Sequence, residues 1–279
     1  APQNAILASN TSNMSITKIG GATQRPDKVV GLHFFNPVVM MLLVEVIRGE
    51  KTSDETMDIT YDLMKKWKNF RGAMVPVRVE KDTAGFIYNR VGSPAGIYLM
   101  EMLQRKLVTP EGVDAKVKSF GSPMGPYETM DYTGLDINSN GMNYLSTVLS
   151  PDYKPRQWLL DLVKAGTLGK KTGKGIYEWP NGERPKIDPA KADPNFDPMD
   201  IICLQVNEGT KLIEQGVARS AAEVDLAITN GGGGAFGPFA LAKGLGWDKV
   251  AAKCEKISRD LGVQWFMPTE MLKKGNIQI

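Results

Sequence analysis

Short apolar runs separated by turn residues open the chain and predict a buried sheet. The runs are residues 5–9, 29–35 and 42–47, and residues 75–79 add a fourth. Continuous apolar runs of this length are typical of strands buried on both faces, as in parallel sheets. Ser53 and two acidic residues then begin a stretch with helical spacing of apolar positions. We therefore expect residues 1–80 to form half of a layered α/β domain, with these strands parallel.

After residue 85 the apolar positions follow helical spacing, and strand-like runs become scarce. A segment rich in Pro, Asp and Lys, residues 183–198, interrupts this pattern and predicts a linker. The expected organisation is therefore an α/β segment (1–80), a first all-α domain (81–182), the linker (183–198) and a second all-α domain (199–279). Overall the chain should be mainly helical.

The two predicted helical domains share a weak internal repeat. Gly112-Val-Asp114 is followed by Gly125-Pro126, and Glu223-Val-Asp225 is followed by Gly237-Pro238, at a period of 111 to 112 residues. Such a period indicates duplication of one helical unit. Chance similarity between two helix-turn segments is the alternative.

Composition excludes several classes of protein. A net charge of +3 is too small for a dedicated nucleic-acid binder, and 42% hydrophobic residues indicate a globular chain. The richest apolar stretch, residues 38–47, is far shorter than the roughly 20 residues of a membrane span, so we expect no membrane segment. Cys203 and Cys254 lack the spacing of a metal site or a disulfide framework, which favours a reducing, cytoplasmic location.

Two glycine-rich segments imitate nucleotide-binding motifs. Residues 232–237 fit the dinucleotide fingerprint G-x-G-x-x-G, but the residues before them predict a helix capped by Ser220 instead of a strand. We interpret them as a helix end and turn. Residues 169–175 resemble a phosphate loop without the Ser or Thr that binds magnesium. Phosphate binding and a solvated lysine turn are equal alternatives there.

His33 is the single histidine of the chain, which excludes a multi-histidine metal site, and we expect no metal. It ends one apolar run, and Glu45 lies within the next. Paired, the two groups satisfy each other, and the free imidazole nitrogen can act as a general base. A purely structural buried pair is the alternative. Residues 9–12 and 33–36 follow neighbouring strands at the edge where open parallel sheets bind ligands. A serine-hydrolase arrangement with Ser12 is disfavoured because the chain has no G-x-S-x-G motif.

Five ordered motifs carry a resemblance to a known family. They are Ala8-Ser-Asn-Thr-Ser12, Gly31-Leu-His-Phe-Phe-Asn-Pro37, Met41-Leu-Leu-Val-Glu-Val46, Asp82-Thr-Ala-Gly-Phe-Ile-Tyr-Asn-Arg90 and Gly169-Lys-Lys-Thr-Gly-Lys-Gly-Ile-Tyr177. With these motifs the sequence resembles the 3-hydroxyacyl-CoA dehydrogenases, including 3-hydroxybutyryl-CoA dehydrogenase. The second helical segment looks like the duplicated tail of members found in β-oxidation multienzyme proteins.

The resemblance implies the carboxyl half of a Rossmann-like domain, followed by two helical domains like the C-terminal domain of 6-phosphogluconate dehydrogenase. It also implies NAD-dependent oxidation of (S)-3-hydroxyacyl-CoA to 3-oxoacyl-CoA, in fatty-acid β-oxidation or a related short-chain acyl-CoA pathway. His33 would be the base and Glu45 would orient it. The other implied residues are Ser12 and Asn89 for the substrate, and Asn10, Asn36 and Lys171 for NAD.

Two departures from the family modify this expectation. The amino-terminal G-x-G-x-x-G unit is missing, so we expect a fragment that is inactive alone. The segment from Lys65 to Pro76 also looks about six residues longer than the usual connection. Acyl-CoA is the expected partner, and a homo-oligomer and a fused or associated enoyl-CoA hydratase are further candidates. The competing hypotheses are a non-catalytic helical oligomerisation or interaction module and an acyl-CoA-binding relic.

Overall fold

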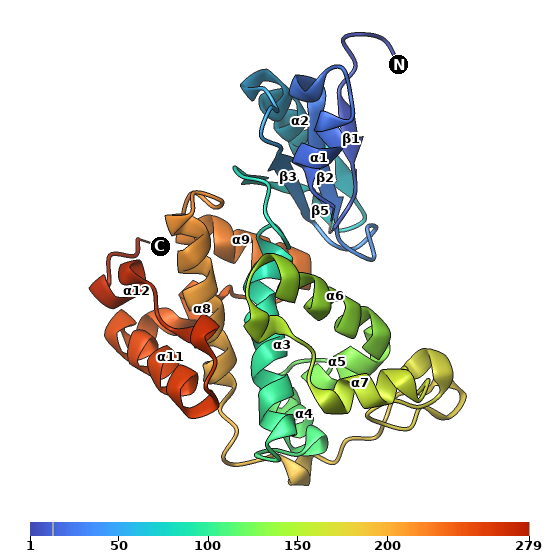
Figure 1. Cartoon of the computed structure of the whole chain (residues 1–279), viewed down its shortest axis with the longest axis vertical. Coiled ribbons are helices and arrows are strands. Elements are labelled where there is room, and N and C mark those ends of the chain that lie inside the picture. The colour runs from blue at the N-terminus through green and yellow to red at the C-terminus, as the bar shows by residue number, and fades with distance from the viewer. Residues whose placement is uncertain (13, 279) are drawn as a thin grey trace. The chain divides into compact units, whose positions relative to one another are not determined.

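The computed structural model describes residues 1–12 and 14–278 and forms two compact units (Figure 1). Unit 1 comprises residues 1–94, 202–257 and 266–279, and unit 2 comprises residues 95–201 and 258–265. The domain boundaries expected from the sequence follow the order of the chain and stay a prediction. Among the described residues, no helix has the length and apolar character needed to cross a membrane.

A four-stranded sheet forms the core of unit 1, in the order β1-β2-β3-β6. The strands are β1 (Leu7–Ser9), β2 (Val29–Phe34), β3 (Leu43–Arg48) and β6 (Val75–Val79). The pairs β1–β2 and β3–β6 are parallel, as expected, but β2 and β3 are antiparallel. The expectation of uniformly parallel strands is therefore wrong at this pair. Residues 35–42 are too short for the crossover of roughly a dozen residues that a parallel pair requires.

Local sequence explains the helices that cover this sheet. Helix α2 (Asp54–Lys66) begins where predicted, because the Ser53 side chain accepts a hydrogen bond from the Thr56 amide. Its acidic first turn and basic last turn complement the helix dipole. Met57 and Met64 pack from α2 onto Val30, Val44 and Val46. The short helix α1 (Ile16–Gly21), capped by Ser15, is followed by a 3-10 turn, η1 (Pro26–Lys28).

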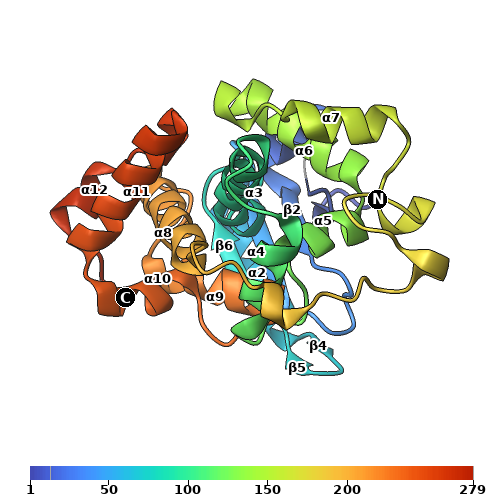
Figure 2. The same cartoon turned by 90° about the horizontal axis from the view of Figure 1, so that it is seen from below.

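The connection between α2 and β6, which the sequence predicts to be longer than usual, contains a small hairpin. Strand β4 (Lys68–Asn69) pairs antiparallel with β5 (Gly72–Ala73), with Lys68 opposite Ala73. Gly72 has φ +137°, a conformation that side-chain-bearing residues rarely adopt. Figure 2 shows the hairpin as a small tip below α2 and β6.

The remainder of unit 1 is helical. It contains the first residues of α3 (Tyr88–Gln104), most of α8 (Pro198–Glu214), and α9 (Ala221–Gly232), α10 (Pro238–Ala242) and α12 (Glu270–Lys274), with most of α11 (Trp247–Leu261) and the 3-10 turn η6 (Lys243–Leu245). Helix α9 lies against the sheet at Gly231, where an added Cβ would come within 2.6 Å of Tyr88 and 2.8 Å of Leu43. A glycine is therefore needed at this contact.

Unit 2 is also mainly helical. Besides most of α3, it contains α4 (Pro110–Ser119), α5 (Pro126–Thr133), α6 (Leu135–Val148) and α7 (Gln157–Lys164). Short 3-10 turns complete it: η2 (Pro151–Tyr153), η3 (Lys170–Thr172), η4 (Pro180–Gly182), η5 (Pro189–Lys191) and η7 (Gln264–Phe266), the last of which ends in unit 1.

At both positions of the internal repeat, an aspartate on one helix accepts hydrogen bonds from the start of the next helix. In unit 2, the Asp114 carboxylate on α4 accepts hydrogen bonds of 2.9 and 2.8 Å from the first amides of α5. In unit 1, Asp225 on α9 accepts bonds of 2.9 and 2.8 Å from the first amides of α10. Burial raises the pKa of Asp114 to about 6 and raises that of Asp225, while these hydrogen bonds oppose the shift. Gly125 and Gly237 allow the close approach, because an added Cβ would lie 2.2 and 2.4 Å from the carboxyl carbons.

The interpretation of residues 232–237 as a helix end is confirmed. Ser220 caps α9 by accepting a bond from the Glu223 amide, and the helix ends at Gly232. Gly233 follows in the left-handed conformation, with φ +72°. No strand precedes this glycine cluster, so it cannot form the strand-turn-helix of a dinucleotide site.

The repeated contact predicts matched effects of two glycine substitutions. Replacing Gly125 or Gly237 by alanine should each lower the free energy of unfolding by roughly 1–3 kcal/mol, because the added methyl overlaps the buried aspartate. Gly244→Ala is the control, since nothing lies within 4 Å of its added Cβ. Urea denaturation measures all three. Equal stability of Gly237→Ala and Gly244→Ala would contradict the proposed contact.

Candidate active site

A buried histidine–glutamate pair lies at one edge of the sheet. His33 on β2 and Glu45 on β3 are directly opposite each other in the antiparallel register. His33 Nδ1 lies 2.7 Å from Glu45 Oε2. Glu45 is fully buried and His33 is 5% exposed, so water contributes little to the hydrogen bonding of either side chain. The two groups therefore depend on each other and on the protein around them.

The second oxygen of Glu45 binds the start of helix α3. Oε1 accepts hydrogen bonds from the amides of Ile87 (2.9 Å) and Tyr88 (2.8 Å). The amino end of a helix also favours a negative charge through its aligned peptide dipoles. Glu45 thus acts as an acceptor at both oxygens, and His33 Nδ1 must be the donor to it. This tautomer leaves Nε2 as the imidazole acceptor, as a general base requires.

Aromatic rings surround the imidazole. The Phe35 ring centroid lies 4.3 Å from that of His33, and the Phe86 centroid lies 5.7 Å away. Phe35 also contacts Tyr88 edge to face, at 4.7 Å. Burial, and secondarily the charge of Glu45, raise the pKa of the Tyr88 hydroxyl. Tyr88 therefore stays protonated and neutral beside the pair.

A tight turn delivers the two amides to Glu45. Gly85 and Phe86 both have positive φ, of 78° and 50°, and the Arg90 amide donates to the Gly85 carbonyl at 3.0 Å. Positive φ is unusual for phenylalanine and persists only where surrounding contacts enforce it. The apolar spacing predicts the helix that follows, but it does not predict this turn.

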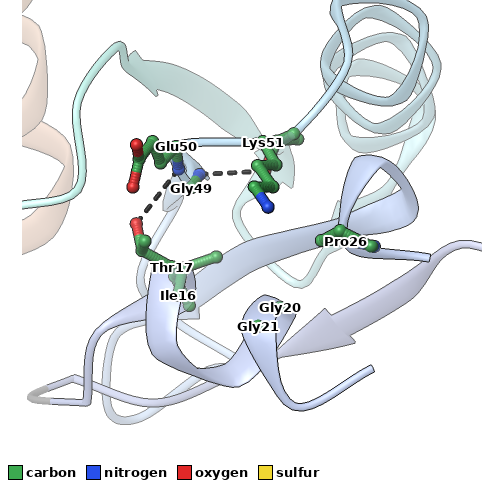
Figure 3. Close-up of a pocket in the computed structure, with 9 residues that line it drawn as sticks. Ile16, Thr17, Gly20, Gly21, Pro26, Gly49, Glu50 and Lys51 are labelled. Carbon is green, nitrogen blue, oxygen red and sulfur yellow. Dashed lines mark hydrogen bonds between the residues drawn. The ribbon is translucent and has the colours of Figure 1, made fainter. Parts of the chain in front are cut away.

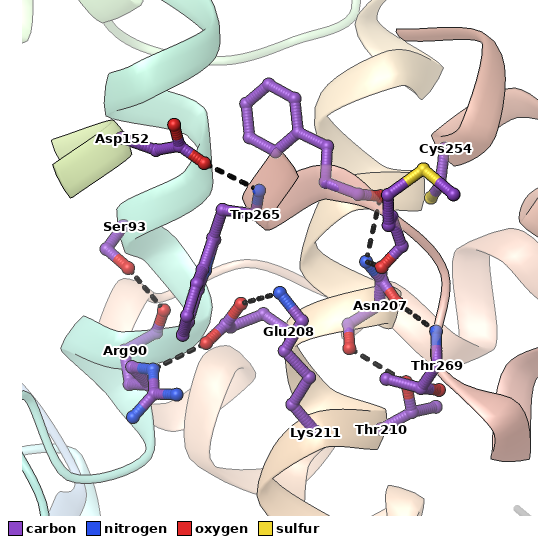
Figure 4. Close-up of polar contacts among 12 residues, drawn as sticks. Arg90, Ser93, Asp152, Asn207, Glu208, Thr210, Lys211, Cys254, Trp265 and Thr269 are labelled. Carbon is purple, nitrogen blue, oxygen red and sulfur yellow. Dashed lines mark hydrogen bonds and ion pairs between the residues drawn. The ribbon is translucent and has the colours of Figure 1, made fainter. Parts of the chain in front are cut away.

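A buried ion pair between Arg90, which binds this turn, and Glu208 links the turn to helix α8 (Figure 4). Arg90 Nε lies 2.5 Å from Glu208 Oε1, and the guanidinium also donates to Thr83 Oγ1 at 3.3 Å. Lys211 contacts the other Glu208 oxygen at 3.1 Å, and burial lowers the pKa of this lysine. Arg90 is 1% exposed and Glu208 is fully buried. Neither was singled out from the sequence, because a charged residue within a helix normally indicates a solvated face.

Three other candidate residues follow β1 or β2, at the sheet edge where His33 lies. Asn10 accepts a hydrogen bond from the Phe34 amide at 3.0 Å, which fixes it beside the end of β2. Ser12 is half-buried and follows β1, which runs parallel to β2, so it lies at the same sheet edge. Asn36 is exposed in the loop after Phe35. Their expected roles toward substrate and NAD stay predictions.

The remaining two candidates lie on other elements. Asn89 is exposed in the first turn of α3, next to the Tyr88 amide that binds Glu45. Lys171 lies in unit 2, where its Nζ is 2.6 Å from both carboxylate oxygens of Asp136. The hydrogen bond from Lys171 lowers the pKa of Asp136. The proposed contact between Lys171 and NAD likewise stays a prediction.

The glycines of residues 169–175 have a structural explanation. Asp131 accepts hydrogen bonds from the amides of Ile176 (2.9 Å) and Tyr177 (2.8 Å) and from the Trp179 indole (2.9 Å). An added Cβ at either Gly169 or Gly175 would come within 2.2 Å of Asp131. Gly169 therefore allows close approach to the Asp131 main chain, and Gly175 allows the loop to close on the buried Asp131 carboxylate.

A small cavity lies at the opposite end of the sheet from His33 (Figure 3). It has a volume of 210 Å³ and is lined by residues of α1, by Pro26 and by residues 49–52, which follow β3. Two amides that line it already donate within the protein, Gly49 to Thr52 Oγ1 and Glu50 to Thr17 Oγ1. Ligand pockets are usually larger, at about 300–1,000 Å³. This cavity is therefore smaller than a typical ligand pocket, and two of its amides are already paired.

Comparison with known proteins identifies the family. Residues 1–83 match the profile of the NAD binding domain of 3-hydroxyacyl-CoA dehydrogenase, and residues 85–179 match that of its C-terminal domain. The chain belongs to the 3-hydroxyacyl-CoA dehydrogenase family. The family inferred from the five motifs is confirmed, and the matched profiles are those of an NAD-binding oxidoreductase.

Relatives and solved structures of this family agree with the fold. The fatty acid oxidation complex subunit alpha of Psychrobacter sp. is 34% identical over 96% of this chain, which spans 39% of that protein. A 3-hydroxybutyryl-CoA dehydrogenase from Escherichia coli superimposes with a TM-score of 0.82 at 25% identity, covering 96% of this chain and 74% of that one. The (S)-3-hydroxybutyryl-CoA dehydrogenase of Ralstonia eutropha is 40% identical over 63% of this chain and 61% of its own, with a TM-score of 0.58. The predicted fold class is confirmed.

The geometry predicts the proton position on His33. In Glu45→Gln the carboxamide oxygen can still accept the hydrogen bonds from the Ile87 and Tyr88 amides. The carboxamide NH₂ must then face His33 Nδ1 and donate to it. The imidazole proton should therefore move from Nδ1 to Nε2. The ¹⁵N chemical shifts of the single histidine report this change directly. Glu50→Gln, an exposed position after β3, should leave the tautomer as it is, and an unchanged tautomer in Glu45→Gln would contradict our assignment.

The Arg90–Glu208 pair predicts a long-range effect on the amides that bind Glu45. Glu208→Gln leaves Arg90 buried without its counter-charge and should lower the free energy of unfolding by about 3 kcal/mol. It should also accelerate hydrogen exchange at Ile87 and Tyr88, because the turn before α3 loses its anchor. Glu223→Gln is the matched control: its pair with Arg219 is half exposed and worth less than about 1 kcal/mol. Unchanged exchange at both amides in Glu208→Gln would show that the ion pair does not hold the turn.

Proposed function

We propose that this chain carries the general base of an enzyme that oxidises (S)-3-hydroxyacyl-CoA to 3-oxoacyl-CoA with NAD. The observation that carries the proposal is the buried pair of His33 and Glu45, found in a chain of the 3-hydroxyacyl-CoA dehydrogenase family. The pair is oriented by a helix amino terminus and leaves one imidazole nitrogen as an acceptor. The names of the similar proteins point to fatty-acid β-oxidation or a related short-chain acyl-CoA pathway.

The proposed proton transfer uses His33 alone as the base. Nε2 of His33 accepts the proton of the 3-hydroxyl group while the C3–H bond breaks and the C3–O bond becomes a carbonyl. The resulting imidazolium donates through Nδ1 to Glu45, whose negative charge stabilises it. Bound NAD supplies the chemistry of hydride acceptance from C3. In the reverse direction, His33 returns the proton to the carbonyl oxygen.

Other polar side chains are assigned to the substrate and to NAD. Asn10 and Asn36 are carboxamides at the ends of β1 and β2, and we assign them to the nicotinamide side of NAD. Ser12 would bind the substrate oxygen and Asn89 the thioester end, while Lys171 would reach the cofactor. The G-x-G-x-x-G match at residues 232–237 follows helix α9 and not a strand, so we expect this chain by itself to oxidise 3-hydroxyacyl-CoA slowly or not at all.

We further propose the organisation in which the reaction takes place. Residues 1–80 would be the carboxyl half of the NAD-binding domain, with helical domains at 81–182 and 199–279 joined by the segment 183–198. The matched proteins are named as subunits of a fatty acid oxidation complex, which supports association with other subunits. From the family resemblance we propose a fused or associated enoyl-CoA hydratase as one candidate partner, and a homo-oligomer as the simpler assembly. A cytoplasmic location is consistent with the two buried cysteines, which form no disulfide with each other.

Turnover of acetoacetyl-CoA tests the proposal. The longest natural form of this chain should oxidise NADH in the presence of acetoacetyl-CoA, and His33→Gln should reduce kcat by roughly 10²–10⁴-fold, the range expected for loss of a general base. The melting temperature of the variant serves as the folding control.

The competing hypotheses give different results in the same assay. A folded parent protein that binds acyl-CoA without oxidising NADH would identify an acyl-CoA-binding relic. A parent protein without turnover or acyl-CoA binding, whose His33→Gln variant melts at a lower temperature, would identify a helical interaction module in which the pair is structural.

A further inference from the structure

Exposed aromatic and basic side chains are concentrated at the β4–β5 hairpin. Residues 65–71 read Lys-Lys-Trp-Lys-Asn-Phe-Arg. The Phe70 side chain is 88% exposed and that of Trp67 is 51% exposed, and all four cationic residues are exposed. Large aromatic side chains left in solvent beside several cations are typical of binding surfaces. We define residues 65–71 as the basic hairpin segment.

The positive charges of this segment are uncompensated within the described residues. None of the ion pairs recorded over residues 1–12 and 14–278 includes Lys66, Lys68 or Arg71. Lys65 lies over the Tyr61 ring, with its Nζ 5.3 Å from the centroid. Asp62 is the nearest acidic residue in the sequence. The segment therefore presents a positive field that favours an anionic partner.

Sheet topology places this segment at the edge that carries His33. Strand β2 ends there, and because β3 is antiparallel to β2 and parallel to β6, the last two strands begin there. The hairpin immediately precedes β6. Asn69 Nδ2 donates to the carbonyls of Val38 (3.2 Å) and Met41 (2.8 Å), in the loop that follows His33. Trp67 stacks on Phe34, with centroids 6.2 Å apart and an interplanar angle of 26°.

The loop held by Asn69 adds an apolar surface to the basic one. Val38, Val39 and Met40 are 45%, 53% and 44% exposed. A partner of this edge should therefore combine negative charge, an aromatic ring that stacks, and an apolar portion. An acyl-CoA has this chemistry, because its 3′-phospho-ADP end carries a diphosphate, a further phosphate and adenine, joined to a less polar acyl arm.

We propose that the basic hairpin segment binds the 3′-phospho-ADP end of CoA, with Lys66, Lys68 and Arg71 on the phosphates and an aromatic side chain against adenine. This inference rests on the proposed acyl-CoA substrate and assigns that substrate a binding surface. NAD shares the ADP group but lacks the 3′-phosphate, so its attraction to the segment is weaker.

Calorimetric titration of the 279-residue chain with CoA tests the assignment. The triple variant Lys66→Gln/Lys68→Gln/Arg71→Gln should raise the Kd for CoA at least about tenfold, because three charge-assisted contacts are lost. Phe70→Ser and Trp67→Ser, tested separately, identify the stacking residue, and the one that stacks should weaken CoA binding by several-fold. The control Lys243→Gln/Lys249→Gln/Lys274→Gln removes the same charge from exposed positions elsewhere in the chain and should leave the Kd unchanged.

Comparison of ligands distinguishes the sources of binding. In the parent chain, 3′-dephospho-CoA and NAD⁺ should bind more weakly than CoA, and this difference should disappear in the triple variant. Equal CoA affinity of the parent and the triple variant would overturn the assignment while leaving the dehydrogenase proposal intact. Binding of the segment to anionic phospholipid vesicles, with CoA affinity unaffected by the substitutions, would overturn it in favour of a lipid surface. Turnover of acetoacetyl-CoA is measured independently, so failure of the proposed function can be recognised separately.

Discussion

The fully buried carboxylate of Glu45 is the constraint on which the rest of the site depends. A charge removed from water costs several kcal/mol unless the protein replaces its hydration. Three donors do so here: His33 at one oxygen and the amides of Ile87 and Tyr88 at the other. These donors come from β2 and from the start of α3, while Glu45 itself is on β3. One carboxylate therefore fixes the relative positions of three elements and, with them, the orientation of the imidazole.

Because Glu45 requires two amides at the start of α3, helix α8 must supply a counter-charge to Arg90. The amides become available only through the turn in which Phe86 adopts positive φ, and this turn is bound by Arg90. Arg90 is buried and needs a counter-charge, which Glu208 supplies from 118 residues further along the chain. Helix α8 thus contributes to the framework that holds His33 and Glu45. Its buried charges are better explained by this positioning than by stability, since apolar side chains of similar size often stabilise as well.

Much of this fold can be predicted from local sequence, and the exceptions have physical causes. The apolar runs located β2, β3 and β6 to within one or two residues, and Ser53 located the start of α2. Apolar runs carry no information on strand direction, however, and the length of residues 35–42 was the unused signal for the antiparallel pair. His33 and Glu45 were found because ionisable residues are conspicuous in buried strands. Glu208 was missed because glutamate is ordinary in a helix, and its burial depends on an arginine far away in the sequence.

The contact between Arg90 and Glu208 has a counterpart elsewhere on the same two helices. Helices α3 and α8 have equal lengths of 17 residues, and aligning their first residues pairs Arg90 with Asp200 and Tyr98 with Glu208. Within unit 1, Arg90 on α3 contacts Glu208 on α8. The residues aligned with this pair form the reverse contact within unit 2, where the Tyr98 hydroxyl on α3 donates to Asp200 on α8 at 2.7 Å. Both contacts have an acidic residue on α8 and a hydrogen-bond donor on α3. The donor is a guanidinium only in the contact next to the turn that binds Glu45. A neutral phenol suffices where the contact joins helices alone, whereas the strained turn has the stronger, charge-assisted pair.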